Sequence, residues 1–567
     1  MPETTAGPDT GIAPLRVACV GGGPGGLFSA IALAHALPDA TIDVYERNRA
    51  DDVFGFGVVF SDATLDAIDV VDPVLRDALA ADGRRWDRIA VHSKGEAVSA
   101  GGNGMSAIHR RVLLDALQTR AAELGARLHF ETPITVDELD ADGRFDLIVG
   151  ADGANSTVRE RFVEDLGHTV DEASVKFIWF GTTYDFDGLT FLHERSEHGN
   201  FAVHAYPIGS GLSTFIVETD EDTWRRAGLD EFDTTQPPGP SDLKTQRYLE
   251  ALFADRIDGH KLVANNSRWS NFRTRSTARW STRGAAGTPV VLIGDAVHTA
   301  HFSVGSGTKM AMEDAAELAG TLAGHPGDMA AALRAFEEAR RPQVARIQDS
   351  ALPSLSWWDH FSEYHRALEP WQFGVHFFTR AISAEKIRVR DPEFVDASRT
   401  RWAERHGADP LNVPLQIDGH RFTSRLLAVA DGAGSTLRLD DGATTITARA
   451  DGADDHGGLA VFTAPDRDTT TLSAGDRERL DALCAGEPSA VAVRGGTALT
   501  RVLCAERIRF RHCIPVVLVE GSDGVRARRA RDMNDNAATL VLSGRADAVA
   551  VEGLRTEMAP KYPEVIR

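Results

Sequence analysis

RVACVGGGPGGLFSAIALAHALPDATIDVYE, residues 16–46, decides how the N-terminal part of the chain folds. An apolar strand pattern leads into the glycines of a G-x-G-x-x-G turn, and an apolar helix pattern and a second strand follow. Gly21 permits the tight turn, Gly23 lets a pyrophosphate approach the backbone, and Gly26 lets the helix pack on the strand. Glu46 ends the second strand, where a carboxylate binds ribose hydroxyls. The stretch predicts a dinucleotide-binding βαβ unit.

Arg47 follows Glu46 and has two interpretations: a contact with the adenine end of the dinucleotide, or a solvated surface arginine. The sequence leaves both open.

Length, charge and cysteine content exclude several classes of protein. The chain has 567 residues, too many for one hydrophobic core, so we expect two to four domains. A formal charge of −22 disfavours nucleic acid and anionic membranes as partners. Four cysteines without paired metal-ligand spacing predict no metal site and a reducing compartment. Neither a signal peptide nor an apolar run of ~18 residues is evident, so we expect a cytoplasmic protein without a membrane span.

The pattern of secondary structure changes along the chain. Alternating aromatic and β-branched residues between 172 and 285 predict an antiparallel sheet. The βα pattern returns at PVVLIGDA, and residues 308–350 and 353–386 are predicted as two helices. A linker near 405–415 precedes a series of short apolar strands.

Two further segments identify the dinucleotide by resemblance. DLIVGADGANSTVR, 146–159, places Asp152 and Gly153 at a strand end, and Gly294–Asp295 end another strand. Together with the glycine turn, in this order, they resemble the FAD-dependent aromatic hydroxylases, which are single-component flavoprotein monooxygenases. The resemblance covers roughly 14–350.

That resemblance implies which residues lie by FAD. Arg110 opens an Arg-x-x-Leu-x-x-x-Leu pattern whose arginine lies beside the flavin in the family. The Gly-rich turn, Asp152–Gly153 and Asp295 are implied to contact FAD, and Gly305 and Gly307 to lie along the isoalloxazine. The resemblance implies that the helix after this loop directs its N-terminus at reduced flavin, where a helix N-terminus stabilises negative charge.

The resemblance also sets the expected architecture, which is an α/β fold. It is a Rossmann-like FAD-binding domain with an inserted antiparallel-sheet substrate domain (the aromatic hydroxylase fold), followed by a truncated βα-barrel-like domain. The predicted parts are a disordered tail (1–13), the FAD-binding domain (14–80, 100–171 and 285–350), the substrate domain (81–99 and 172–284), a helical segment (351–405) and the C-terminal domain (410–567).

Four segments are similar to one branch of that family. FGFGVVFSDATL (54–65), FIVETDEDTWRRAGLD (215–230), NNSRWSNF (265–272) and HFSVGSGTK (301–309) resemble the branch of salicylyl-CoA 5-hydroxylase and 2-aminobenzoyl-CoA monooxygenase/reductase. The resemblance implies an aryl or ring acyl-CoA substrate, transient NADH or NADPH, O2, and oxygen delivery through a flavin C4a-hydroperoxide. It also leads us to expect a homodimer. Two alternatives stay open: oxygenation of a tropone-type or free aromatic or polyketide ring in secondary metabolism, and a non-catalytic flavin-binding scaffold.

Three residues are candidates for contact with the substrate. His301 and Phe302 stand where most aromatic hydroxylases carry prolines, so they form an unusual wall beside the reactive flavin carbon. His301 is interpreted either as a hydrogen-bonding partner of substrate or peroxide, or as a loop histidine that fixes the backbone. His204, in FAVHAYP, is predicted to face either the substrate or the core.

The last 155 or so residues resemble a reduced old-yellow-enzyme domain. The first, second and last three strands of that barrel have counterparts, and the middle strands with the reductase residues have none. A βα barrel typically needs eight units and about 250 residues, so we expect no ordinary closure and no FMN. An unrelated α/β domain is the alternative.

Overall fold

The computed structural model describes residues 13–53, 55–237, 239–431, 436–449, 458–521, 530–552 and 554. The predicted tail therefore lies almost entirely outside the described residues. The chain forms two compact units. One comprises the chain up to Asp87 with Gly104–Leu189 and Val203–Ala351, and the other comprises Arg88–Asn103, Thr190–Ala202 and the chain from Leu352 onward. The domain boundaries given above remain a prediction.

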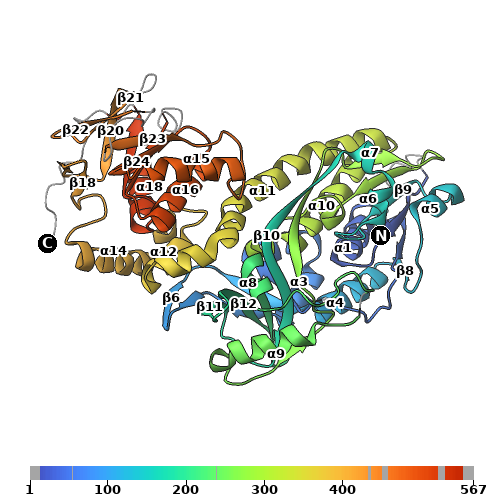
Figure 1. Ribbon diagram of the computed structural model, residues 1–567. Helices are drawn as coiled ribbons and strands as arrows, with labels where there is room; N and C mark the ends of the chain where they lie inside the picture. Colours follow the sequence, from blue (N-terminus) through green and yellow to red (C-terminus); the bar gives the residue numbers. More distant parts are fainter. Residues whose placement is uncertain are drawn as a thin grey trace, which may run out of the picture. The chain divides into compact units, whose positions relative to one another are not determined.

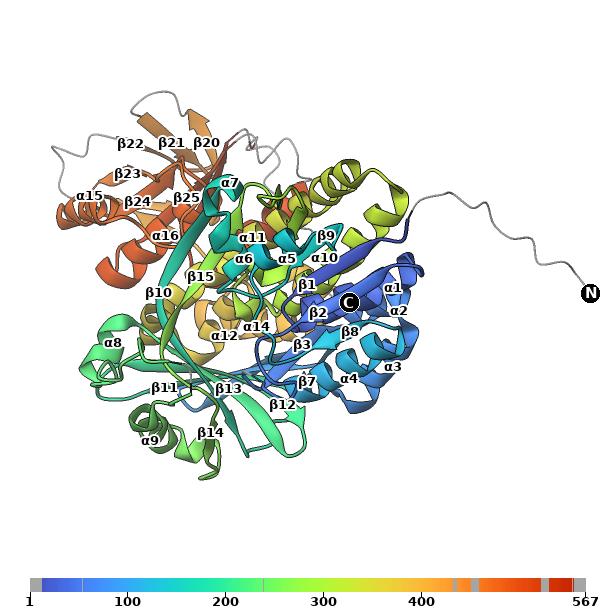
Figure 2. The same cartoon turned by 90° about the vertical axis from the view of Figure 1, so that its right-hand side faces the viewer.

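The first unit contains a sheet of six strands in the order β16-β17-β9-β1-β2-β8, with only β16 antiparallel. Figure 2 labels β9, β1, β2 and β8 of this sheet. The strands are β1 (Arg16–Val20), β2 (Thr41–Tyr45), β8 (Arg127–His129), β9 (Leu147–Gly150), β16 (Ser281–Arg283) and β17 (Pro289–Leu292). α1 (Pro24–Ala36) connects β1 to β2 and packs against α10 (Gly307–Gly324). The predicted βαβ unit is thus confirmed, and buried apolar residues of β1, α1 and β9 form its core.

A second sheet in this unit is antiparallel, as the alternation after residue 172 predicts. β14 (Leu262–Ala264), β10 (His168–Thr182), β13 (Leu212–Thr219) and β12 (Asn200–Gly209) follow one another, and β15 (Ser270–Thr277) also pairs with β10 (Figure 2). A smaller sheet joins β3 (Gly57–Ser61), β7 (Met105–His109) and β4 (Arg84–Trp86). The unit's other helices are α2 (Asp62–Val71), α3 (Pro73–Asp82), α4 (Arg110–Glu123), α5 (Val136–Asp142), α6 (Thr157–Arg161), α7 (Val163–Leu166), α8 (Glu221–Arg226) and α9 (Leu243–Leu252), with 3-10 turns η1 (Ala254–Arg256), η2 (Gly294–Ala296) and η3 (Phe302–Val304).

The prediction of separate helices at 308–350 and 353–386 is wrong, because α11 runs unbroken through Met329–Ala367. Proline removes one backbone donor, which favours a helix end before Pro353. The aromatic residues that follow outweigh this cost, because Trp357, Trp358 and Phe361 are buried in the second unit. The predicted domain boundary at 350 therefore falls inside one helix.

The second unit contains a closed barrel of seven strands, β20 to β26. They are β20 (Leu426–Asp431), β21 (Thr436–Asp440), β22 (Thr445–Arg449), β23 (Leu459–Thr463), β24 (Ala490–Arg494), β25 (Val516–Glu520) and β26 (Ala548–Glu552). As expected, this segment does not form an ordinary barrel of eight βα units, but the barrel is closed rather than open. The barrel does close, because the antiparallel pair β21 and β22 replaces the missing βα units and joins β20 to β23. Apolar side chains of the strands fill its interior.

Helices cover the outside of this barrel (Figure 1). They are α15 (Ala474–Ala485), α16 (Ala498–Arg507) with the π-helical η4 (Ile508–His512), and α18 (Ala530–Leu542). The same unit holds β5 (Ile89–Ser93), β6 (Glu96–Ala100), most of β11 (Leu189–Arg195), α12 (Pro370–Phe378), α13 (Ala384–Arg388), α14 (Pro392–His406) and the hairpin of β18 (Leu415–Ile417) and β19 (His420–Phe422).

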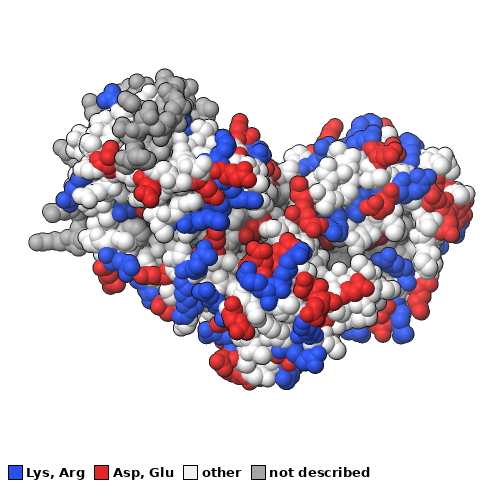
Figure 3. Space-filling view, in the orientation of Figure 1, with Lys and Arg blue, Asp and Glu red and all other residues white. Residues whose placement is uncertain are grey.

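Acidic and basic side chains are interspersed over the face shown in Figure 3. Among the described residues, no helix is long and apolar enough to cross a membrane. Within the same ranges, no group of three or more His, Cys, Asp or Glu side chains is arranged to hold a metal ion.

Candidate functional site

The glycine turn between β1 and α1 is shaped by close backbone contacts. A Cβ on Gly21, whose φ is +110°, would lie 2.5 Å from the carbonyl oxygen of Ala151. A Cβ on Gly26 would lie 2.0 Å from the carbonyl oxygen of Gly21, so both positions are closed to side chains. A Cβ on Gly23, the N-cap of α1, would meet no atom within 4 Å. Gly21 and Gly26 therefore serve packing, while Gly23 faces open space at the helix N-terminus.

Seven of the predicted cofactor residues line one cavity of about 900 Å³ in the first unit. They are Gly21, Gly23, Glu46, Arg47, Arg110, Asp152 and Gly153. Such a volume is ordinary for a cofactor site. The glycine turn and the segments at 46, 110 and 152 are thus brought together as predicted, although 64 and 42 residues separate the last three along the chain.

Glu46 is held in place by the turn that it faces. Its carboxylate accepts hydrogen bonds from the backbone N–H of Gly22 (2.8 Å) and from the N–H (2.8 Å) and amide (2.7 Å) of Asn48. Asn48 also lines the cavity, and the sequence did not single it out. Its position two residues after the acidic strand end is the signal that could have identified it.

Asp152 organises the segment that follows β9. It accepts hydrogen bonds from Ser156 Oγ (2.5 Å) and from the backbone N–H of Thr157 (2.7 Å). Arg159 then donates to the carbonyl oxygens of Ala154 (2.9 Å) and Ala296 (3.0 Å). This arginine fastens the segment after β9 to the segment after β17.

Asp295 lies outside that cavity's wall but belongs to the same region. The Asp295 side chain borders open space on one side. Protein on its other sides removes water from the carboxyl group and raises its pKa, while His298 and Arg110 act to lower that pKa. Burial lowers the pKa of Arg110, and Tyr206 and Asp295 act in the opposite direction. Arg110 and Asp295 are therefore electrostatic neighbours, although 185 residues separate them along the chain.

A buried carboxylate that the sequence did not reveal supports the turn before Asp295. Asp314, on α10, accepts hydrogen bonds from the backbone N–H of Gly294 (2.9 Å) and from Arg340 Nε (2.8 Å), and contacts His298 Nε2 (2.7 Å). Burial alone would raise the pKa of Asp314, but His298 and Arg340 outweigh it and lower the pKa. The three donors fix the backbone that presents Asp295.

The loop from His301 to Gly307 folds into η3 and then into α10. His301 caps η3: its Nδ1 accepts from the backbone N–H of Ser303 (3.3 Å) and contacts Ser303 Oγ (2.8 Å). This geometry favours the interpretation of His301 as a residue that fixes the loop backbone. Gly305 has φ +63°, and a Cβ on Gly307 would lie 3.8 Å from Asp295 Oδ1. Gly307 thus borders Asp295, whereas a Cβ on Gly305 would lie 4.0 Å from the side chain of Val59.

Phe302 belongs to a partly exposed aromatic surface, here called the aromatic wall: Phe177, Trp179, Phe272 and Phe302. The Phe302 ring lies 5.1 Å from that of Phe177 and 6.1 Å from that of Trp179. The His204 ring lies 5.3 Å from Phe302, and His204 itself is buried. Of the two alternatives for His204, the structure places it at the core side of this wall.

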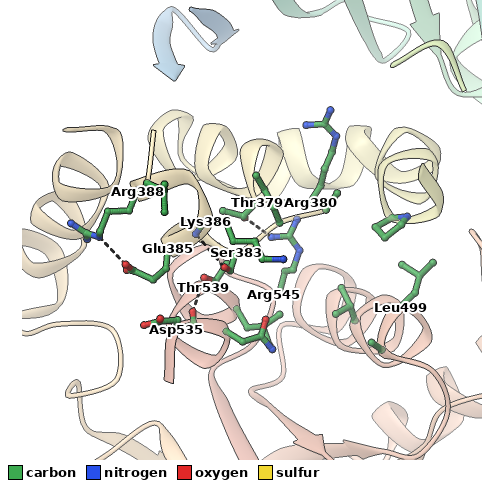
Figure 4. A pocket seen from close by; sticks show the side chains of 18 residues that line it. Thr379, Arg380, Ser383, Glu385, Lys386, Arg388, Leu499, Asp535, Thr539 and Arg545 are labelled. Carbon is green, nitrogen blue, oxygen red and sulfur yellow. Dashed lines mark hydrogen bonds and ion pairs between the residues drawn. The ribbon is translucent and has the colours of Figure 1, made fainter. Parts of the chain in front are cut away.

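The second unit has a cavity of about 730 Å³ that none of the predicted site residues lines. Figure 4 shows its polar side chains bonded to one another: Arg545 donates to Thr379 (2.9 Å) and Arg388 to Glu385 (2.9 Å). Burial, followed by Arg545, lowers the pKa of Arg380 to about 9. The polar groups of this wall are thus largely satisfied within the unit.

Comparisons with known proteins show where the similarity lies. The family described as FAD binding domain matches residues 15–351. Salicyloyl-CoA 5-hydroxylase of a Streptomyces species is 51% identical over 94% of this chain and 99% of its own length. The 3-hydroxy-4-methyl-anthranilyl-(aryl-carrier protein) 5-monooxygenase of Streptosporangium sibiricum is 36% identical over 60% of this chain and 89% of its own length. Among solved structures, the tetrameric form of 2-methyl-3-hydroxypyridine-5-carboxylic acid oxygenase is 20% identical, with a TM-score of 0.47, over 60% of this chain and 90% of that chain.

Proposed function

Because this chain belongs to the FAD binding domain family of aromatic monooxygenases, we propose that it hydroxylates an aromatic ring carried as a coenzyme A thioester. One observation carries the proposal: the relative at 51% identity, matched over 94% of this chain, bears the name salicyloyl-CoA 5-hydroxylase. The relative at 36% identity is named for an aromatic acid held on a carrier protein. In both names the aromatic acid is attached to a carrier rather than free.

The overall reaction balances with O2 as oxidant and NADH or NADPH as reductant. One oxygen atom enters the ring as a hydroxyl group, and the other leaves as water together with the oxidised nicotinamide. Bound FAD supplies the electron transfer from the nicotinamide and the activation of O2. The protein's own residues bind the cofactor, position the ring and exclude water.

The residues of the first unit fit FAD. Gly23 leaves room at the N-terminus of α1, where backbone N–H groups attract a pyrophosphate. The Glu46 carboxylate is held at the end of β2, where it can accept from ribose hydroxyls. Arg110 lines the cavity and Asp295 is its electrostatic neighbour, so these two residues are the ones proposed to meet the remainder of the cofactor.

The aromatic wall suits a flat ring. Its four rings are partly exposed, and ring stacking together with apolar contact stabilises an aromatic group placed against them. Phe302 is common to this wall and to the loop that ends in Gly305 and Gly307. An aromatic substrate held here would lie between the sheet and the loop predicted to contact the flavin. We propose that His301 fixes this loop and that Phe302 contacts the substrate.

A turnover experiment with matched substrates tests the proposal. Holoenzyme is supplied with NADH or NADPH and with salicyloyl-CoA, free salicylate or coenzyme A alone, and NAD(P)H oxidation, O2 uptake, H2O2 and product mass are measured. We expect only the thioester to accelerate NAD(P)H oxidation and gain one oxygen atom. If free salicylate is oxygenated and salicyloyl-CoA is not, the proposal of a thioester substrate is refuted and an oxygenase of free aromatic rings is favoured. If no aromatic compound changes the rate of NAD(P)H oxidation, the alternative of a non-catalytic flavin-binding scaffold is favoured.

For the C-terminal barrel we propose a structural role without FMN. Extraction of the flavins from the purified full chain is expected to release FAD and no FMN. Stoichiometric FMN would contradict this role.

A further inference from the structure

The cavity of about 730 Å³ in the second unit lies in a part of the chain that FAD does not explain. All of its lining residues come after residue 352, whereas the match to the FAD binding domain family ends at residue 351. Its volume falls within the range of about 300–1,000 Å³ that is usual for small-molecule sites. Apolar side chains line it together with four cations, which are Arg380, Lys386, Arg388 and Arg545.

Two of these four cations are paired with carboxylates inside the unit. Arg388 Nε lies 2.9 Å from Glu385, and Arg545 Nε lies 3.2 Å from Glu506. Glu385 also pairs with Arg399 (2.7 Å), so its charge is shared between two arginines. The charges of Arg388 and Arg545 are therefore balanced without a ligand.

Arg380 differs from them, because neutral acceptors hold its guanidinium group. Its Nε donates to Ser354 Oγ (2.9 Å) and its Nη1 to the carbonyl oxygen of Phe377 (2.9 Å), and the group lies 4.0 Å from the centre of the Phe377 ring. Burial, followed by Arg545, lowers the pKa of Arg380 to about 9, and no carboxylate among the described residues opposes this shift. A partly buried cation without a counterion is costly, and an anion bound in the cavity would offset that cost.

Lys386 adds a second cation that lacks a carboxylate. Its side chain is exposed, and it forms no ion pair within the part of the chain that the structure describes. Figure 4 places Arg380 and Lys386 on the wall of this cavity. With Glu385 and Asp535 as the acids, cations outnumber acids four to two among the lining residues. On a chain with a formal charge of −22, this local excess of cations favours an anionic ligand.

The lining also defines what the anion is attached to. A planar guanidinium group and an ammonium group both bind phosphate oxygens. Much of the remaining wall is apolar and suits a flat or apolar body: Pro353, Ile382, Leu499, Val502 and Leu540. An organic phosphate therefore fits the cavity better than inorganic phosphate. Coenzyme A ends in an adenosine with a 3′-phosphate and a 5′-diphosphate, which has this composition.

We propose that the cavity of the second unit binds the phosphate-bearing adenosine end of a coenzyme A thioester, with Arg380 and Lys386 as phosphate ligands. The inference rests on the proposed function, because that function supplies the coenzyme A group. It assigns recognition of the carrier to residues outside the FAD binding domain. Arg388 and Arg545, whose charges are balanced within the unit, maintain the shape of the wall.

Calorimetry on the FAD-saturated full chain tests this site with adenosine 3′,5′-bisphosphate, a probe that carries the phosphates and no reacting ring. We expect one bisphosphate to bind per chain, and adenosine and inorganic phosphate to bind at least about tenfold more weakly. Lys386→Gln should raise the Kd about 10-fold and Arg380→Gln about 30-fold, because each removes a charged donor from a phosphate. Absence of binding to wild type, or an unchanged Kd in both variants, overturns the proposal. Inorganic phosphate that binds as tightly as the bisphosphate overturns the assignment to a nucleotide.

Arg511→Gln is the matched control for Lys386→Gln. Arg511 is an exposed arginine of the second unit that does not line the cavity, and its replacement changes the net charge by the same amount. Its Kd should equal that of wild type. If the control weakens binding as much as Lys386→Gln does, overall charge explains the effect and the site is overturned. If Arg380→Gln does not fold, the exposed Lys386 decides alone.

Turnover with salicyloyl-CoA separates this inference from the proposed function. We expect Lys386→Gln to raise KM about tenfold, a larger change than in kcat, because a remote phosphate contact is present in both the ground state and the transition state. If wild type oxygenates the thioester and Lys386→Gln and Arg380→Gln keep its KM, the inference alone is overturned. If wild type binds the bisphosphate through Lys386 but oxygenates no thioester, the proposed function alone is refuted.

Discussion

Replacing Asp314 with asparagine should cost this protein both folding free energy and flavin affinity. Asp314 Oδ2 receives the backbone N–H of Gly294 and the Nε2 of His298, while Oδ1 receives the Nε of Arg340. Asparagine offers only one acceptor oxygen and places an NH2 group where the other was. The NH2 group of the asparagine must therefore point at one of the N–H groups that now donate to Asp314, and that hydrogen bond is lost.

The magnitude follows from the lost charge. Hydrogen bonds to charged groups contribute about 1.5–3 kcal/mol each, and a buried ion pair broken on one side costs about 3–5 kcal/mol. Arg340 keeps a second carboxylate, because its Nη2 lies 3.0 Å from Glu313. We therefore expect a loss near 3 kcal/mol. The turn at Gly294 should loosen as well, and we expect the Kd for FAD to rise about tenfold, which is a separate loss of about 1.4 kcal/mol in binding free energy.

Asp72→Asn provides the control, because buried Asp72 has the same three kinds of partner. It accepts from the N–H of Leu75 (2.8 Å) and from Arg120 Nε (2.7 Å), and contacts His35 Nε2 (2.8 Å). Urea unfolding should show similar losses for both variants, while FAD titration of the apoproteins should show a weaker Kd only for Asp314→Asn. Equal FAD affinities in the two variants would refute the reasoning that Asp314 acts through the flavin site.

Three further predictions concern packing and pH. Gly26→Ala should yield folded protein without bound FAD, because the new Cβ would lie 2.0 Å from the carbonyl oxygen of Gly21; a normal flavin spectrum contradicts this. Burial lowers the pKa of His376 to about 4, so the unfolded chain binds an extra proton between about pH 6.5 and 4. Stability should therefore fall by up to about 3 kcal/mol as pH drops through that window, and His376→Gln should lack this component in urea titrations. Glu506→Ala should destabilise the second unit by about 3–5 kcal/mol, because the buried Arg545 (3.2 Å from Glu506) loses this carboxylate and keeps only neutral acceptors such as Thr379, and a melting temperature equal to wild type would oppose this.

The outcome for the barrel shows how far a strand pattern can lead. The sequence predicted the order of its strands and the shortage of βα units. It did not predict closure, because the antiparallel pairing of β21 and β22 depends on backbone hydrogen bonds between strands and not on the pattern within either strand. The continuity of α11 through Pro353 was missed for a similar reason. Burial of aromatic residues in the second unit, which no local propensity records, outweighs the cost of the proline.

The sequence by itself determined the dinucleotide turn, since the strand, the G-x-G-x-x-G spacing and the helix all lie within residues 16–46. The resemblance to the aromatic hydroxylases also named Arg110 and Asp295, through the motifs that carry it. Only the tertiary structure decided that these two are electrostatic neighbours and that Glu218 meets His204. Strand register and helix packing set such meetings between residues far apart in the chain, and neither has a period that a single sequence displays.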